Sequence, residues 1–166
     1  MREYTFIDID TCEMCGSPSN EHKVLGMRLD SSQGKNPKNK TGISVGVKQC
    51  LNCNLIFSSP KPIPSNIQDH YGTPPEDYWK AEYFKWTPKY FKYEIETAKK
   101  RISFQKGMKA LDIGAGLGKA MLSLEHFGFE AYGLEPSIPF YERAIKKMNI
   151  KPDRLQLGAI EDLDYK

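Results

Sequence analysis

The clearest indication of the fold is the stretch Leu111-Asp112-Ile113-Gly114-Ala115-Gly116-Leu117-Gly118, which is typical of the end of a strand, a glycine-rich turn and the start of a helix. Residues 108–113 are the expected strand, and the helix is expected at 119–127, where Gly128 ends it. Glycines in such a turn let the backbone reverse sharply and allow a ligand to lie against it. We therefore expect a ligand site at the carboxyl end of this strand.

The residues that follow continue the alternation of strand and helix. A second strand is expected at 129–134, a second helix at 137–148 with Ser137 as its cap, and a short third strand at 154–157. This βαβαβ order predicts parallel strands covered by helices, as in one half of a doubly wound sheet. The predicted fold class is therefore α/β.

An acid follows the second strand, because Glu135 comes directly after Leu134. A carboxylate at this place can accept hydrogen bonds from both hydroxyls of a ribose. Two other known glycine-loop motifs fit this sequence less well. A dinucleotide fingerprint would require Gly or Ala where Lys119 stands. A P-loop would require Gly in place of Ile113 and a hydroxyl residue in place of Ala120.

The remaining pattern, an acid before Gly-x-Gly-x-Gly and a second acid ending the next strand, resembles the class I S-adenosylmethionine-dependent methyltransferases. Their third strand leads into an adenine-contacting turn, and residues 158–163 (Gly-Ala-Ile-Glu-Asp-Leu) resemble it, with Ala159 where the family often has Asp. The resemblance covers about residues 105–165 and implies a Rossmann-like core. It implies that S-adenosylmethionine contacts these residues: Asp112, Gly114, Ala115, Gly116, Gly118, Glu135, Ile160 and Glu161. Glu161 or Asp162 would then replace the missing adenine-binding Asp.

Four cysteines form two pairs of equal spacing, Cys12-x-x-Cys15 and Cys50-x-x-Cys53. Two residues between cysteines let one tight turn point both sulfurs at one ion, and two such turns complete a tetrahedral Zn²⁺ shell. The polar loop 31–42 lengthens the gap between the pairs. We predict a structural zinc site, because four thiolates leave no open position for water or substrate. Iron remains an alternative.

The segment between the cysteines and the glycine loop is rich in proline and aromatic residues. It opens with Pro60, Pro62 and Pro64, and a helix is expected to start at Pro74 or Pro75 and to break into two helices at Pro88. The predicted organisation is a zinc ribbon at 1–60, a helical aromatic linker at 61–106 and the amino-terminal half of a cofactor-binding domain at 107–166.

Together, the three segments are similar to zinc-containing C-methyltransferases of sugar-nucleotide pathways. The resemblance implies methyl transfer to a small molecule such as a sugar nucleotide, which the amino-terminal module helps to hold. It also implies that linker tyrosines approach the reacting sugar, and Tyr71, Tyr78 and Tyr83 lie in that region. The alternative for these tyrosines is aromatic core packing. No residue is assigned as a general base, and the methyl acceptor is not identified.

A complete class I methyltransferase has further strands after the third. We therefore expect the strand at 108–113 to form a sheet edge, and the chain alone to be inactive because the acceptor side of the site is missing. A second copy covering that edge would give a homodimer, with cover by the aromatic linker as the alternative.

Composition narrows the class of protein to which the chain can belong. The chain has 166 residues, 39% hydrophobic and 27% charged, and its 24 basic and 21 acidic residues leave a net charge of +3. No run approaches the roughly 18 to 20 apolar residues of a membrane span. Because no signal peptide is recognised, we expect a cytoplasmic protein with reduced cysteines. The alternative function is a zinc-ribbon binding protein that contacts nucleic acid or a protein partner through a basic linker, with a degenerate half-domain; near-balanced charge makes nucleic acid the weaker partner.

Overall fold

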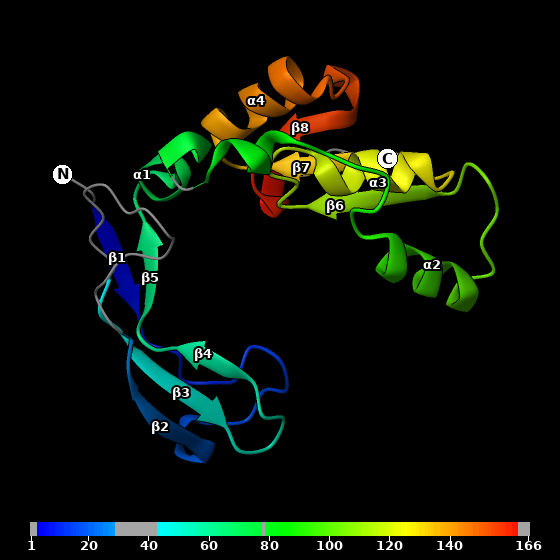
Figure 1. The fold of residues 1–166 in the computed structure, drawn as a ribbon. Coiled ribbons are helices and arrows are strands. Elements are labelled where there is room, and N and C mark those ends of the chain that lie inside the picture. The colour runs from blue at the N-terminus through cyan, green and yellow to red at the C-terminus, as the bar shows by residue number, and fades with distance from the viewer. Residues whose placement is uncertain (1–2, 29–42, 78, 163–166) are drawn as a thin grey trace. The chain divides into compact units, whose positions relative to one another are not determined.

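The computed structural model describes residues 3–28, 43–77 and 79–162, and the structural statements below concern these residues. The predicted polar loop at 31–42, Tyr78 and Leu163 lie outside the described residues. The chain divides into two compact units, unit 1 at Met1–Asp69 and unit 2 at His70–Lys166, each described by itself. Figure 1 shows the strands of unit 1 in blue, cyan and green and the sheet of unit 2 in yellow-green to red.

Unit 1 consists of short antiparallel strands. β1 (Tyr4–Ile7) pairs with β5 (Lys61–Pro64), and a second sheet has the order β2 (His22–Met27), β3 (Gly46–Cys50), β4 (Ile56–Ser58). β3 is the central strand of this sheet. It runs into the second cysteine turn, where the N–H of Cys50 donates to the carbonyl of Leu55.

Few apolar side chains of unit 1 are buried. Val45 is 2% exposed, whereas Val24 and Met27 on β2 are 67% and 66% exposed. The best-buried side chains include two of the cysteines, Cys12 and Cys50. Small domains with so little apolar core depend on a cross-link or a metal for their stability.

Unit 2 is built on a three-stranded parallel sheet of order β6 (Lys109–Ile113), β7 (Glu130–Glu135), β8 (Leu155–Leu157). Helix α3 (Lys119–His126) connects β6 to β7, and α4 (Ile138–Met148) connects β7 to β8. The predicted alternation of strand and helix is confirmed, and the protein is a mixed α/β chain. Because the strands are parallel, their carboxyl ends meet at one edge of the sheet, where the two helices begin.

Local sequence explains the ends of α4. The hydroxyl of Ser137 accepts a hydrogen bond from the N–H of Phe140 at 3.4 Å, and Pro139 occupies the first turn. The helix ends at Met148, and Asn149 follows it with a φ of 55°, the left-handed conformation that Asn tolerates at helix ends. The predicted cap at Ser137 is therefore confirmed.

The core of unit 2 joins the glycine loop, both helices and the sheet. Its most buried members, each 1% exposed or less, are Leu117, Met121, Ala131, Ala144 and Leu155. Aromatic residues from the preceding segment pack against this core, namely Tyr83, Phe84 and Trp86.

The first helix predicted in the aromatic segment is wrong. Instead of a helix from Pro74 or Pro75, the structure has single 3₁₀ turns at Pro75–Asp77 and Ala81–Phe84, and a short helix α1 (Ile67–Tyr71) lies before them. The second predicted helix is present as α2 (Lys92–Arg101). Packing of the aromatic side chains against the core fixes an irregular path here, because tertiary contacts override local helix preference.

The units also divide the chain differently from the three predicted segments. β5 pairs with β1 inside unit 1, and unit 2 contains both the aromatic residues and the parallel sheet. Within the described residues, no helix combines the length and the apolar character that crossing a membrane requires.

Candidate functional site

The glycine loop lies at the carboxyl ends of β6 and β7. The N–H groups of Gly114 and Ala115 both donate to the carbonyl of Leu134, at 2.8 and 2.9 Å. These bonds fold the start of the loop back onto β7. The loop therefore rests on the end of the neighbouring strand, and the acid that follows Leu134 is brought beside it.

Glu135 is the centre of the site, and it is only 6% exposed. Its Oε2 accepts a hydrogen bond from the N–H of Gly116 at 2.6 Å, and its Oε1 accepts one from the N–H of Ser137 at 2.8 Å. The carboxylate thus joins the loop after β6 to the start of α4. An ionised carboxylate has about four acceptor positions, so about two remain for a ligand.

Burial raises the pKa of Asp112, the next-to-last residue of β6. Burial also raises the pKa of Glu135; the amides of Ser137 and Gly116 oppose the rise, and the charge of Asp112 adds to it. Two acids that repel each other in a partly buried site favour a ligand that donates hydrogen bonds or carries positive charge, since either stabilises the ionised forms.

The three glycines of the loop have different surroundings. A Cβ added to Gly114 would meet open space, whereas one added to Gly118 would lie 2.6 Å from Cγ1 of Ile150. At Gly116 the nearest atoms would be Cδ1 of Phe140 at 3.7 Å and the hydroxyl of Tyr83 at 3.9 Å. Gly118 is therefore required for packing, and Gly114 leaves room on the open side of the loop.

The turn predicted to contact adenine follows β8. The N–H of Gly158 donates to the carbonyl of Glu135 at 3.1 Å, which places the start of this turn beside the central acid. The side chain of Asp162 accepts from the N–H of Ala159 at 2.9 Å and so stabilises its own turn. Ile160 and Glu161 are exposed, and within the described part of the chain no hydrogen bond joins them to the glycine loop. Their contact with a ligand stays a prediction.

Lys119 is a member of the site that the sequence did not reveal. It is 9% exposed, and its Nζ donates to the backbone carbonyl of Tyr83 at 3.1 Å. The same Nζ lies 4.5 Å from the ring centroids of both Tyr83 and Tyr90. Burial lowers the pKa of Lys119. The only sequence signal was the Gly118-Lys119 pair, which resembles part of a P-loop.

The linker tyrosines are placed differently from one another. Tyr83 brings its hydroxyl near Gly116, whereas Tyr71 contributes a backbone carbonyl that accepts from the hydroxyl of Ser137 at 2.6 Å. Tyr83 also packs against the core, which is the alternative that the sequence left open.

The four cysteines form a candidate metal centre in unit 1. Their sulfurs all lie within 4.8 Å of one another. The Sγ atoms of Cys12 and Cys53 are 3.6 Å apart, as are those of Cys15 and Cys50. A tetrahedral shell with metal–sulfur bonds of about 2.3 Å would place its sulfurs about 3.8 Å apart. The cluster therefore fits a four-thiolate zinc or iron site.

The turns around the cysteines supply hydrogen-bond donors. Hydrogen bonds from the hydroxyl of Ser17 and, to a smaller extent, from its backbone N–H lower the pKa of Cys15 to about 6. The pKa of Cys50 is lowered mainly by a hydrogen bond from the backbone N–H of Cys53. The pKa of Cys53 is raised to about 12: the N–H of Leu55 opposes the rise, while burial and the neighbouring sulfurs outweigh it. Four thiolates this close repel one another, so a bound cation is what would stabilise them together.

No protein-family model and no curated protein matches the chain. Among solved structures, a protein from Anabaena variabilis ATCC 29413, provisionally named a methyltransferase from an antibiotic biosynthesis pathway, is similar to this chain at 28% identity and a TM-score of 0.36. The match covers 43% of this chain and 28% of that protein. This likeness covers too little of either protein, and is too loose, to assign the chain to a family.

Proposed function

We propose that unit 2 binds S-adenosylmethionine on the loop at 114–118 and that the protein is a methyltransferase for a small molecule. The observation that carries this proposal is the hydrogen bond from the N–H of Gly116 to Glu135 at the carboxyl edge of a parallel sheet. Ligands of open α/β sheets bind at this edge. A buried acid at the end of β7 and a half-buried acid near the end of β6, with a glycine loop between them, suit a ligand with hydroxyl groups and a cationic part.

The roles follow from the position of each group. Glu135 would hold the ribose hydroxyls with its remaining acceptor positions, and Asp112 would face the ammonium group of the methionine part. Gly114 and Gly116 would let the ligand lie close to the backbone, and the turn at Ile160–Asp162 would approach the adenine. When bound, S-adenosylmethionine supplies an activated methyl group, and the chain's own part is orientation. A sugar nucleotide is the acceptor class we favour.

The cysteine cluster would hold a structural zinc ion. The sulfur spacing supports this role, as does the shortage of buried apolar side chains in unit 1. Four cysteine ligands would leave no position for substrate. The ion would therefore hold unit 1 folded and take no part in the methyl transfer.

Calorimetry with S-adenosylhomocysteine tests the proposal directly. The full chain should bind one equivalent, and Glu135→Gln should weaken binding. The control is Glu130→Gln at the other end of β7, where the carboxylate pairs with Arg154 at 2.5 Å and accepts from the hydroxyl of Tyr132 at 2.9 Å. This control should keep wild-type affinity. Failure of the wild-type protein to bind at millimolar nucleotide would refute the proposal.

A further inference from the structure

A segment of unit 2 connects the starts of α3 and α4 beside the glycine-loop site. We call residues 71–77 and 79–86 the strap. At one end, the carbonyl of Tyr71 accepts from the hydroxyl of Ser137, at the start of α4. Toward the other end, the carbonyl of Tyr83 accepts from Lys119, at the start of α3. Both helices begin at the carboxyl edge of the sheet, so the strap spans the edge where the ligand would bind.

The strap also reaches into the site. The hydroxyl of Tyr83 lies near Gly116, and the ring of Trp79 stacks on that of Tyr83 with centroids 4.7 Å apart and planes 20° from parallel. The backbone N–H of Trp79 donates to the carbonyl of Pro75 at 3.0 Å. The turn at Pro75–Asp77 is thus linked through Trp79 to the side chain that faces the loop.

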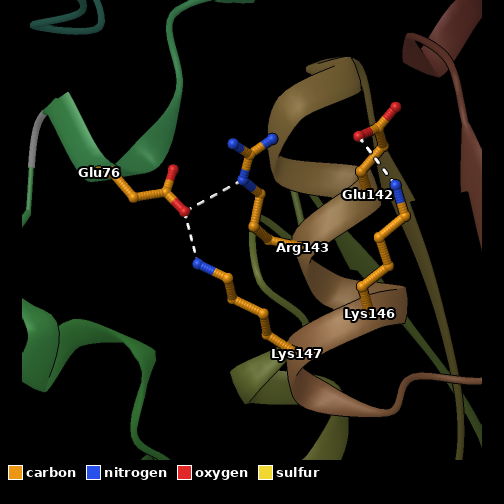
Figure 2. Close-up of a pocket in the computed structure, with 5 residues that line it drawn as sticks. All are labelled: Glu76, Glu142, Arg143, Lys146 and Lys147. Atoms are coloured by element: carbon orange, nitrogen blue, oxygen red, sulfur yellow. Dashed lines mark hydrogen bonds and ion pairs between the residues drawn. The ribbon is translucent and has the colours of Figure 1, made fainter.

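Charge fastens this turn to α4. Oε1 of Glu76 accepts from Nε of Arg143 at 3.1 Å and from Nζ of Lys147 at 2.6 Å, as Figure 2 shows. The two cations lie one helical turn apart and converge on one carboxylate oxygen. The side chains of Glu76 and Lys147 are 37% and 50% exposed, so both ion pairs are open to solvent and to salt.

The opposite end of the strap is fastened by other means. Nε1 of Trp86 donates to the hydroxyl of Ser123 at 2.8 Å, and Ser123 is fully buried. Tyr83 and Phe84 pack against the core of unit 2. These contacts depend on apolar burial and neutral hydrogen bonds, which salt screens little. Lys119, which donates to the carbonyl of Tyr83, is charged as well, but it is only 9% exposed, so salt screens it little. Among the described residues, the solvent-exposed ion pairs that fasten the strap are those of Glu76. Nζ of Lys147 also lies 4.6 Å from the ring centroid of Phe84.

We propose that Glu76, with Arg143 and Lys147, is an electrostatic latch that holds the strap closed over the glycine-loop site and that its release lets the ligand enter and leave. This inference rests on the proposed function, because it takes the glycine loop as the ligand site. It assigns a regulatory role to a surface ion-pair cluster that lies outside the ligand contacts themselves. Ligand exchange should accordingly depend on ionic strength.

The same helix offers a matched control. Glu142 pairs with Lys146 at 3.3 Å along α4, in the same view of Figure 2, and this pair does not involve the strap. Glu76→Gln and Glu142→Gln make the same chemical change in two neighbouring ion-pair groups. Only the first should release the latch.

The experiment is stopped-flow measurement of S-adenosylhomocysteine dissociation from the full chain at 0.05 and 0.5 M NaCl. We expect Glu76→Gln to speed dissociation roughly three- to tenfold at low salt, the effect of losing one or two exposed ion pairs. Wild type and Glu142→Gln should approach the rate of Glu76→Gln only at high salt. Iodide quenching of Trp79, taken as the difference between each protein and its Trp79→Phe version, should increase in Glu76→Gln without ligand.

The outcomes separate the two proposals. Equal dissociation rates in Glu76→Gln and Glu142→Gln, with the nucleotide bound by both, would overturn the latch and leave the proposed function standing. Absence of nucleotide binding by wild type would overturn the proposed function, and the latch with it. Increased quenching of Trp79 with an unchanged dissociation rate would show that the strap moves without controlling ligand exchange, which also overturns the latch.

Discussion

The carboxylate of Glu135 accepts a hydrogen bond from the N–H of Gly116, at 2.6 Å, across the two loops that end β6 and β7. Its other oxygen accepts from the N–H of Ser137. One buried acid therefore fixes the glycine loop and the start of α4 together before any ligand is present. A change at this position will affect the fold of the site as well as its affinity.

Glu135→Gln should lower both the stability of the protein and its affinity for S-adenosylhomocysteine. A glutamine has one acceptor oxygen and places an NH₂ group against one of the two backbone donors, so we expect the free energy of unfolding to fall by about 1 kcal/mol. The loss of a charged acceptor for ribose should weaken S-adenosylhomocysteine binding by about 1.5 to 3 kcal/mol. Urea denaturation and calorimetry measure the two effects. Wild-type affinity in a folded Glu135→Gln protein would remove Glu135 from the ligand site.

Two glycine substitutions should separate packing from ligand binding. Both Gly114 and Gly118 have positive φ, near 75°, so alanine at either place should cost about 1 to 2 kcal/mol of backbone strain. Gly118→Ala also forces a methyl group against Ile150, which adds about 1 to 3 kcal/mol. Gly114→Ala should instead mainly weaken nucleotide binding, because its methyl group would enter the open side of the loop. Equal losses of stability in the two variants would contradict this assignment.

The cysteine cluster should bind one metal ion per chain. Elemental analysis of the purified protein should find one zinc or iron, and Cys50→Ser should lose it, because Cys50 is fully buried beside the other sulfurs. Met14→Ser, an exposed change inside the first cysteine turn, is the control and should keep the metal. Amide hydrogen exchange in unit 1 should increase when the metal is removed with a chelator. Unchanged exchange after complete removal would show that the ion does not support this unit.

The sequence predicted those parts of the fold whose signals are local. The glycines at 114, 116 and 118 mark a turn between a strand and a helix, and Ser137 and Pro139 mark the start of α4. The paired Cys-x-x-Cys spacing likewise predicted that four sulfurs converge. In each case the residues that make the feature lie within a few positions of one another, or repeat a spacing that only one geometry uses.

The parts that were missed depend on contacts between distant residues. Glu76 and Arg143 are 67 positions apart, and Lys119 and Tyr83 are 36 apart, so neither pair has a local signature. A helix was predicted from Pro74 or Pro75, yet the path of this segment is set by the core against which its aromatic side chains pack. Burial of Lys119 against two tyrosine rings also runs against the usual expectation that lysine lies at the surface.

The outer edge of β6 is expected to mediate self-association. Among the described residues no strand pairs with that edge, and Leu111 and Ile113 are 39% and 57% exposed. Sedimentation at several concentrations should show a dimer, and Ile113→Lys should favour the monomer, since a charge on an open edge opposes strand pairing. Ile56→Lys, an equally exposed position in unit 1, is the control. A strictly monomeric wild type would refute this expectation.

The last prediction concerns acid. The pKa of Glu76 is lowered from 4.5 to about 2: burial opposes the fall, and the hydrogen bonds from Lys147 and Arg143 outweigh it. Because the folded-state pKa is the lower one, Glu76 contributes stability above about pH 4.5, and this contribution disappears as the pH falls toward 2. The group is exposed, so solvent screening should limit the contribution to about 1 kcal/mol or less.

The test compares urea denaturation of wild type and Glu76→Gln from pH 7 to pH 3 at low ionic strength. The groups around Glu76 are Arg143 and Lys147, which face it, and the Glu142–Lys146 pair on the same helix. We expect wild type to be more stable at pH 7 and the difference to shrink steadily below pH 4.5, with 0.5 M NaCl reducing it at every pH. Glu142→Gln corrects for the loss of an exposed ion pair that does not hold the strap. A difference that grows as the pH falls would mean that Glu76 is not stabilised in its ionised form by these two cations.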